Sequence, residues 1–133
     1  MSDSNSFDQC PCSGKTLARI VQPAVLAILA EQPLHGYLIV QRLRTMRMFR
    51  EECPDPAGVY RTLKSMEQRG LVTSSWDMAK AGPAKRRFTM TARGRACLEQ
   101  WAQTLEEYAC SIEDLLAVIR EVSRDSRAAK QSK

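Results

Sequence analysis

Two groups of basic residues have the types and spacing needed to bind a polyanion such as nucleic acid. In the first, Arg61 and Lys64 lie about one helical turn apart, and Tyr60 adds a hydroxyl beside them. The second surrounds a Gly-Pro turn and comprises Lys80, Lys85, Arg86 and Arg87. Arginine and lysine neutralise phosphates, and their side chains read base edges in the major groove of a duplex. These residues, together with Ala57 near the start of the same helical stretch, are our candidate contacts to double-stranded DNA.

Three cysteines form a second candidate site. Cys10 and Cys12 flank one proline, and Cys53 precedes the helical stretch near the positive end of its dipole, which favours a thiolate. Thiol oxidation or a soft metal would then be coupled to nucleic-acid binding. The alternative is a reactive but incidental tail, because the chain has no Cys-x-x-Cys and His35 is its only histidine. Cys10, Cys12 and Cys53 therefore remain a candidate effector, redox or metal site, and we assign no metal or other cofactor.

The sequence shows no catalytic signature. It has no Gly-rich phosphate loop, no nucleophile elbow and no histidine-centred dyad. Its acids gather toward the C-terminal end, and they are typical of a solvated helix face: Glu106, Glu107, Glu113 and Asp114. The other two cysteines, Cys97 and Cys110, fit small core residues of that helix. We therefore expect a protein that is not an enzyme.

Charge is distributed unevenly along the 133 residues, whose 44% hydrophobic and 26% charged content is typical of one globular domain. The net charge of +5 combines +9 over residues 15–95 with −5 over residues 96–123, and the two ends contribute −2 and +3. A basic body is suited to meet phosphates. The acidic arm would repel them, so it must do something else.

Membrane insertion and secretion are not expected. The longest nearly apolar stretch, residues 24–30, is far shorter than the ~20 residues of a membrane-spanning helix. The first fourteen residues carry two acids and no base, unlike a secretory signal. An odd number of cysteines, five, argues against a disulfide framework. We expect a cytoplasmic protein.

Three helices are predicted to position the basic groups. The first covers residues 15–31 and restarts near Gln22, because Pro23 suits a first turn better than a helix interior. The second covers residues 35–46. The third has the clearest limits, with Asp55 as N-cap, Pro56 at the first helical position, Gly70 past the end, and an inward stripe of Val59, Leu63 and Met66.

Two strands complete the predicted domain. Residues 71–77 and 85–90 alternate in the way strands do, and together they predict a hairpin with a basic tip. Three helices followed by a hairpin make a mainly α fold with a small β-hairpin wing, the winged helix-turn-helix. We assign it to residues 15–90, after a flexible cysteine-containing tail over residues 1–14.

The last helix, predicted over residues 91–123, carries a strict apolar repeat. Its spacing alternates between three and four residues, the 3.5-residue period of a coiled-coil seam: Leu98, Trp101, Leu105, Tyr108, Ile112, Leu115, Ile119 and Val122. These positions span a rod of roughly 36 Å, so we expect the same helix of a second copy to cover it. The alternative is that the arm folds back over its own domain. Residues 124–133 are expected to be a disordered basic tail.

Several ordered motifs resemble the PadR-like transcriptional regulators. The residues that carry the resemblance lie between about Gln22 and Trp101: His35-Gly36-Tyr37, Gly58-Val59-Tyr60-Arg61-Thr62-Leu63, Met66-Glu67, Gly70-Leu71-Val72, Trp76, Gly82-Pro83-Ala84-Lys85-Arg86-Arg87-Phe88 and Thr91-Ala92-Arg93-Gly94. The resemblance implies a homodimeric repressor that binds a pseudo-palindromic operator through the third helix and the wing. It also implies release of the DNA by an effector that shifts the dimer halves.

The effector stays open at this point. We expect a single helix after the hairpin, which resembles the short members of the family, and this weakens any inference of an aromatic-acid ligand. Trp101 and Tyr108 on the seam could stack a flat apolar small molecule, although such residues are more often plain packing. Two other functions remain as alternatives: a thiol- or metal-responsive regulator, and a winged-helix adaptor whose basic face binds an acidic protein.

Overall fold

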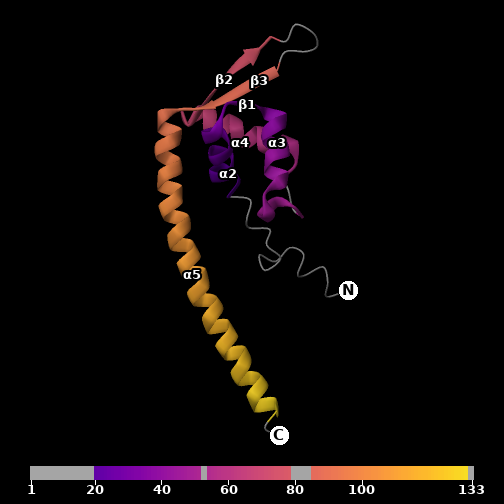
Figure 1. The fold of residues 1–133 in the computed structure, drawn as a ribbon, viewed down its shortest axis with the longest axis vertical. Coiled ribbons are helices and arrows are strands. Elements are labelled where there is room, and N and C mark those ends of the chain that lie inside the picture. Colours follow the sequence, from indigo (N-terminus) through magenta and orange to yellow (C-terminus); the bar gives the residue numbers. More distant parts are fainter. Residues whose placement is uncertain (1–19, 52–53, 79–84, 132–133) are drawn as a thin grey trace. The chain divides into compact units, whose positions relative to one another are not determined.

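The computed structural model describes residues 20–51, 54–78 and 85–131, with side chains up to Ala128. The chain divides into two units, residues 1–98 and residues 99–133. Among the described residues, the strands and the short helices belong to the first unit, and the second unit is part of one long helix (Figure 1). Among the helices of the described ranges, none has the length and hydropathy needed to span a bilayer.

The helices of the first unit are α2 (Val21–Glu31), α3 (Gly36–Thr45) and α4 (Pro56–Gln68). Pro23 lies in the first turn of α2, where its missing N–H costs no helical hydrogen bond, as predicted. The limits of α4 are also confirmed. Asp55 Oδ1 accepts a hydrogen bond of 2.9 Å from the Gly58 N–H, and Gly70 follows the helix with a φ of 76°.

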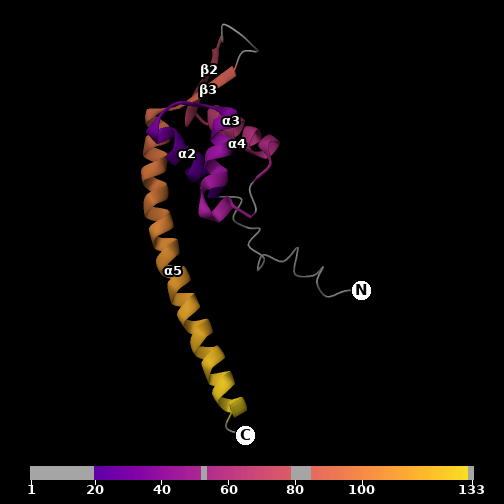
Figure 2. The ribbon, with the colours of Figure 1, turned by 45° about the vertical axis from the view of Figure 1, so that its right-hand side comes forward.

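A small antiparallel sheet has the order β1-β3-β2, where β1 is Leu34–His35, β2 is Val72–Asp77 and β3 is Lys85–Met90. Strands β2 and β3 are the predicted hairpin, and they run side by side away from the helices (Figure 2). The sequence did not predict β1, because two residues are too few to show an alternating pattern. Its pairing of Leu34 with Phe88 fixes the start of α3 against the wing.

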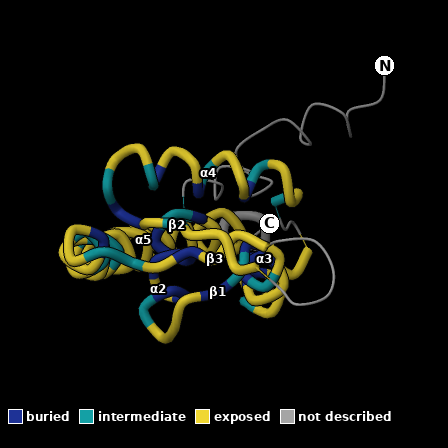
Figure 3. The backbone as a smooth tube through the Cα atoms, turned by 90° about the horizontal axis from the view of Figure 1, so that it is seen from above, coloured by how far each residue is buried: buried dark blue, intermediate teal, exposed yellow. Residues whose placement is uncertain are grey.

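The core lies where α2, α3 and α4 meet the sheet, and Figure 3 shows the buried residues gathered at the centre of this unit. The predicted stripe of α4 is completely buried. Phe49, at the end of the short 3-10 helix Arg47–Phe49, is only 2% exposed and belongs to this core. The largest fully buried side chains are Val25, Leu26, Ile39, Leu43, Phe49, Val59, Leu63, Met66 and Val72.

The last helix begins within the first unit. The Thr91 hydroxyl caps it, accepting a hydrogen bond of 3.0 Å from the Gly94 N–H. The same hydroxyl lies within hydrogen-bonding distance of the carbonyl oxygens of Gly70, at 2.6 Å, and Leu71, at 3.0 Å. The end of α4, the start of β2 and the start of the last helix are therefore tied together at one point.

Helix α5 (Ala92–Gln131) continues beyond its predicted end. The sequence indicates a disordered tail from residue 124, but the helix runs on to Gln131. The physical reason is in the sequence, since residues 124–131 hold no Gly or Pro and are rich in Arg and Ala, which are good helix formers. Basic residues near a helix C-terminus also interact favourably with its dipole.

Candidate nucleic-acid interface

One side of α4 is covered by the core and the other side is exposed. At 100° per residue, Ala57, Tyr60, Arg61 and Lys64 fall within an arc of about 100°, opposite the buried stripe. All four are exposed. Arg61 and Lys64 form no ion pair with any residue that the structure describes. The helix therefore presents a hydroxyl and two uncompensated cations on one rigid face.

Tyr60 also packs against the start of α3, a contact that the sequence did not reveal. The end of its ring lies over Gly36, where a Cβ would come within 2.8 Å of the ring carbon Cζ and 2.7 Å of the hydroxyl. The side chain is still 43% exposed. This contact with the start of α3 explains why a glycine stands between His35 and Tyr37.

The wing residue Arg86 is held between α4 and the sheet. Its Nη2 donates to Glu67 Oε1 at 3.0 Å, and its Nε donates to Ser74 Oγ at 2.8 Å. Its guanidinium carbon lies 5.8 Å from the ring centres of both Trp76 and Phe88. A cavity of about 410 Å³ adjoins this network, lined by Tyr60, Lys64, Glu67, Gln68, Arg86 and Phe88.

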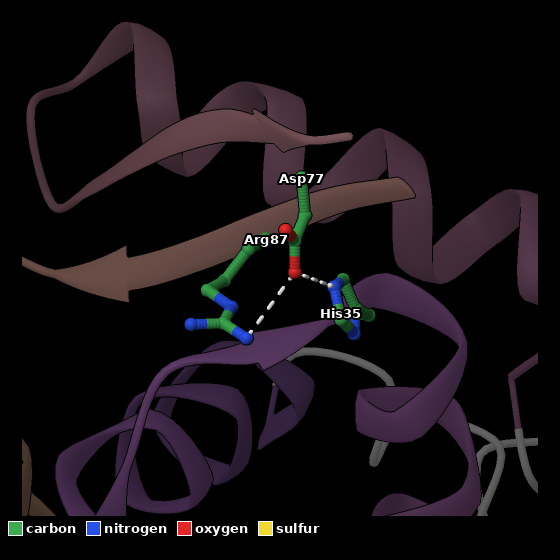
Figure 4. A network of polar contacts seen from close by, with 3 residues as sticks. All are labelled: His35, Asp77 and Arg87. Atoms are coloured by element: carbon green, nitrogen blue, oxygen red, sulfur yellow. Dashed lines mark hydrogen bonds and ion pairs between the residues drawn. The ribbon is translucent and has the colours of Figure 1, made fainter. Parts of the chain in front are cut away.

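The next residue of β3 points to the other face of the sheet. Arg87 Nη2 lies 3.3 Å from Asp77 Oδ2, and the same oxygen lies 3.1 Å from His35 Nε2 (Figure 4). One carboxylate on β2 thus joins all three strands. His35 lies directly before α3, so this contact joins the start of that helix to the sheet.

Lys85 shares the face of Arg87. Its ammonium lies 5.1 Å from the ring centre of Tyr37, a cation–π distance. Lys85 and Arg87 are both exposed, so both can reach an anion from this face. Lys80, the remaining candidate of the wing, lies outside the described residues.

The structure does not describe the candidate effector, redox or metal site. Cys10, Cys12 and Cys53 all lie outside the described residues. Within residues 20–51, 54–78 and 85–131, no three His, Cys, Asp or Glu side chains come together as a metal site would require. Of the two described cysteines, Cys97 is half-buried, and Cys110 is exposed, unlike a core residue.

The seam of α5 is exposed along most of its length in the described chain. Leu98, Trp101 and Leu105 are half-buried, whereas the later positions are between 52% and 62% exposed: Tyr108, Ile112, Leu115, Ile119 and Val122. Two further apolar residues, Leu116 and Val118, are 40% and 57% exposed and occupy the positions that flank a coiled-coil seam. The predicted stripe is therefore an unpaired apolar surface, wider than the repeat alone indicated.

Comparison with solved structures gives the same fold. A protein from Thermoplasma acidophilum described as a candidate transcriptional regulator aligns with a TM-score of 0.64 and 27% identity, over 77% of this chain and 96% of that one. A PadR family transcription regulator from Clostridium difficile aligns with a TM-score of 0.64 and 23% identity, over 72% of this chain and 97% of that one.

A third structure is that of PadR from Bacillus subtilis in complex with operator DNA. It aligns with a TM-score of 0.57 and 23% identity, over 63% of this chain and 47% of that one. At this identity the likeness concerns the fold alone. No curated protein matches the sequence.

The sequence itself identifies the family. Residues 25–100, more than half of the chain, match the transcriptional regulator PadR-like family. This region contains the exposed face of α4, the wing and the Thr91 junction. The chain therefore belongs to the PadR-like family of transcriptional regulators.

Proposed function

We propose that this regulator is a sequence-specific protein for double-stranded DNA, acting as a homodimer on a pseudo-palindromic operator. The observation that carries the proposal is the exposed face of α4, where Tyr60, Arg61 and Lys64 stand opposite a fully buried stripe. A helix held rigidly from behind, with donors in front, has the form of a recognition helix for the major groove.

The wing supplies further positive charges, with a different proposed target. Lys85 and Arg87 lie on the exposed face of β3, and Lys80 belongs to the same basic turn in the sequence. In our proposal they contact phosphates and so set the position of the domain, while α4 reads the bases. The operator complex of the Bacillus subtilis protein, which shares the fold, supports this assignment.

A second copy of the chain is our proposed partner for α5. Its seam exposes large apolar side chains over several heptads, and burial against an identical helix would remove them from water. A two-fold axis through the pair would present two α4 helices to half-sites about 10 to 20 bp apart.

Regulation would act on that spacing. We propose a repressor, released when an effector shifts the halves of the dimer so that both recognition helices no longer fit at once. The protein would act in the cytoplasm, where it meets its operator, and by binding rather than by catalysis.

The test is selection of duplex DNA by the purified full chain, followed by binding measurements across a range of salt. We expect one enriched palindromic sequence and an affinity that falls steeply with salt, because several phosphates are neutralised. Arg61→Gln and Lys64→Gln should weaken binding. Arg120→Gln, an exposed change on α5, should not.

Two results would overturn the proposal. One is selection that enriches no sequence. The other is binding that responds equally to Arg61→Gln and to the Arg120→Gln control, as it would for a basic surface that attracts any polyanion.

A further inference from the structure

The carboxylate of Glu67 uses both of its oxygens to join α4 to the wing. Oε1 accepts from Arg86 at 3.0 Å, and Oε2 accepts from the Ser74 hydroxyl at 2.5 Å. The Ser74 oxygen accepts in turn from Arg86 Nε. The three side chains form a closed triangle between α4, β2 and β3.

This triangle differs from an ordinary surface ion pair. An isolated exposed pair contributes little, because water screens it and two flexible side chains must be ordered. Here Arg86 makes two hydrogen bonds to different partners, and its guanidinium lies 5.8 Å from two aromatic rings. Glu67 is only 29% exposed. Bonds that share their partners in this way reinforce each other.

The position of Glu67 on α4 connects this triangle of side chains to the exposed face of the helix. Glu67 stands at the edge of the exposed face, two helical turns after Tyr60, and both residues line the cavity beside Phe88. A displacement of Arg86 would therefore change how the hairpin sits beside the face of α4 that carries Lys64.

We propose that Glu67 is a positioning residue of the DNA interface, and that Arg86 anchors the wing to the recognition helix instead of binding a phosphate. The proposal rests on the proposed function for its effect on DNA. The anchor itself is a property of the protein without DNA. Phosphate binding by the wing is then left to Lys85 and Arg87, on the opposite face of β3, together with Lys80 of the same basic turn.

The first experiment measures amide hydrogen exchange in β2 and β3 of the full chain without DNA. Glu67→Ala and Arg86→Gln should each speed exchange by about tenfold, because each removes charged hydrogen bonds. The double variant should be no faster than either single variant. Glu67→Gln, which keeps one acceptor oxygen, should fall between Glu67→Ala and the wild type.

The matched control is Glu106→Ala, which removes an exposed carboxylate from α5 and should leave exchange in the strands unchanged. Alanine is the best helix former, so neither alanine variant weakens its helix through propensity. Unchanged exchange in Glu67→Ala and Arg86→Gln would overturn the anchor.

The second experiment measures how DNA affinity depends on salt. Arg86→Gln should lower affinity several-fold through displacement of the wing and leave the slope of log affinity against log salt unchanged. Arg87→Gln should make that slope shallower by about 0.9 for each phosphate that is no longer neutralised. If Arg86→Gln makes the slope shallower as Arg87→Gln does, Arg86 binds a phosphate and the proposal fails.

The two experiments separate the two proposals. If the wild-type protein selects no DNA sequence, the proposed function is wrong, and hydrogen exchange still decides whether Glu67 anchors the wing. If DNA binding is found and exchange is unaffected by Glu67→Ala, only the anchor is wrong.

Discussion

The ring of Tyr60 on α4 lies directly over Gly36, the first residue of α3. The contact joins two of the motifs in the sequence, because Gly36 belongs to His35-Gly36-Tyr37 and Tyr60 belongs to residues 58–63. A side chain at position 36 would occupy the space of the ring. Tyr60 also belongs to the exposed face of α4 that we propose to contact DNA.

Gly36→Ala should displace the Tyr60 ring at little cost in stability. The new Cβ meets the far end of a half-exposed side chain, which can rotate toward solvent. We predict a change of less than about 1 kcal/mol in the free energy of unfolding and a weaker affinity for the selected DNA. Chemical denaturation and the NMR signals of the ring measure both effects. In a Tyr60→Ala background the substitution should have no further effect on binding, and an unfolded Gly36→Ala variant would show that the ring cannot move.

Gly94→Ala should be far more damaging than the same substitution at position 36. Here the Cβ would meet the backbone carbonyl oxygen of Leu71 and lie 2.9 Å from Met90 Cγ. Backbone cannot rotate away, so we predict a loss of about 3 kcal/mol in the free energy of unfolding. Denaturant titration of the two variants side by side is the measurement. Equal stability of both would contradict the distinction between rigid and flexible neighbours.

The paired substitutions Ile112→Asp and Leu115→Asp should separate the proposed dimer. Both residues are about 60% exposed on the seam, and charge there would have to be buried between helices. We predict a monomer at micromolar concentration in sedimentation, and a loss of at least about 100-fold in affinity for the full operator, because the second half-site no longer adds avidity. Ala117→Asp lies outside the seam and should remain dimeric. A wild-type protein that sediments as a monomer and still binds its full operator would refute the role of α5.

Asp77→Asn should strengthen DNA binding. Asp77 is about half exposed and neutralises Arg87, so its removal frees a cation of the wing. We predict an affinity about threefold higher at low salt, with the gain disappearing as salt screens the charges. The effect on stability should stay below about 1 kcal/mol, since exposed pairs contribute little. Asp114→Asn on α5 is the charge-matched control, and a weaker affinity for Asp77→Asn would show that the carboxylate orients Arg87 for its contact.

The helices and strands could be predicted where residues within one short segment determine them. The limits of α4 follow from Asp55, Pro56 and Gly70, and its buried stripe follows from helical period, because caps and periodicity are properties of short segments. The hairpin was likewise predicted from alternation within each strand, and the structure pairs Ser74 with Phe88. The family followed from motifs in a fixed order along the chain.

The sequence did not show the contacts between residues that lie far apart in the chain. Glu67 and Arg86 are 19 positions apart, and only the fold brings them to 3.0 Å. The burial of Phe49 and the pairing of Leu34 with Phe88 are likewise set by tertiary packing, which leaves no periodic trace in so short a segment. The end of α5 was missed for another reason, since a run of charged residues is compatible with a solvated helix as well as with disorder.

The bonds of Thr91 have a consequence for signalling. Because its hydroxyl joins the carbonyls that follow α4 to the first turn of α5, we expect a displacement of that turn to be passed on to the end of α4. In the homodimer and the effector response that we propose, a ligand that displaces the first turn of α5 would thereby also displace α4.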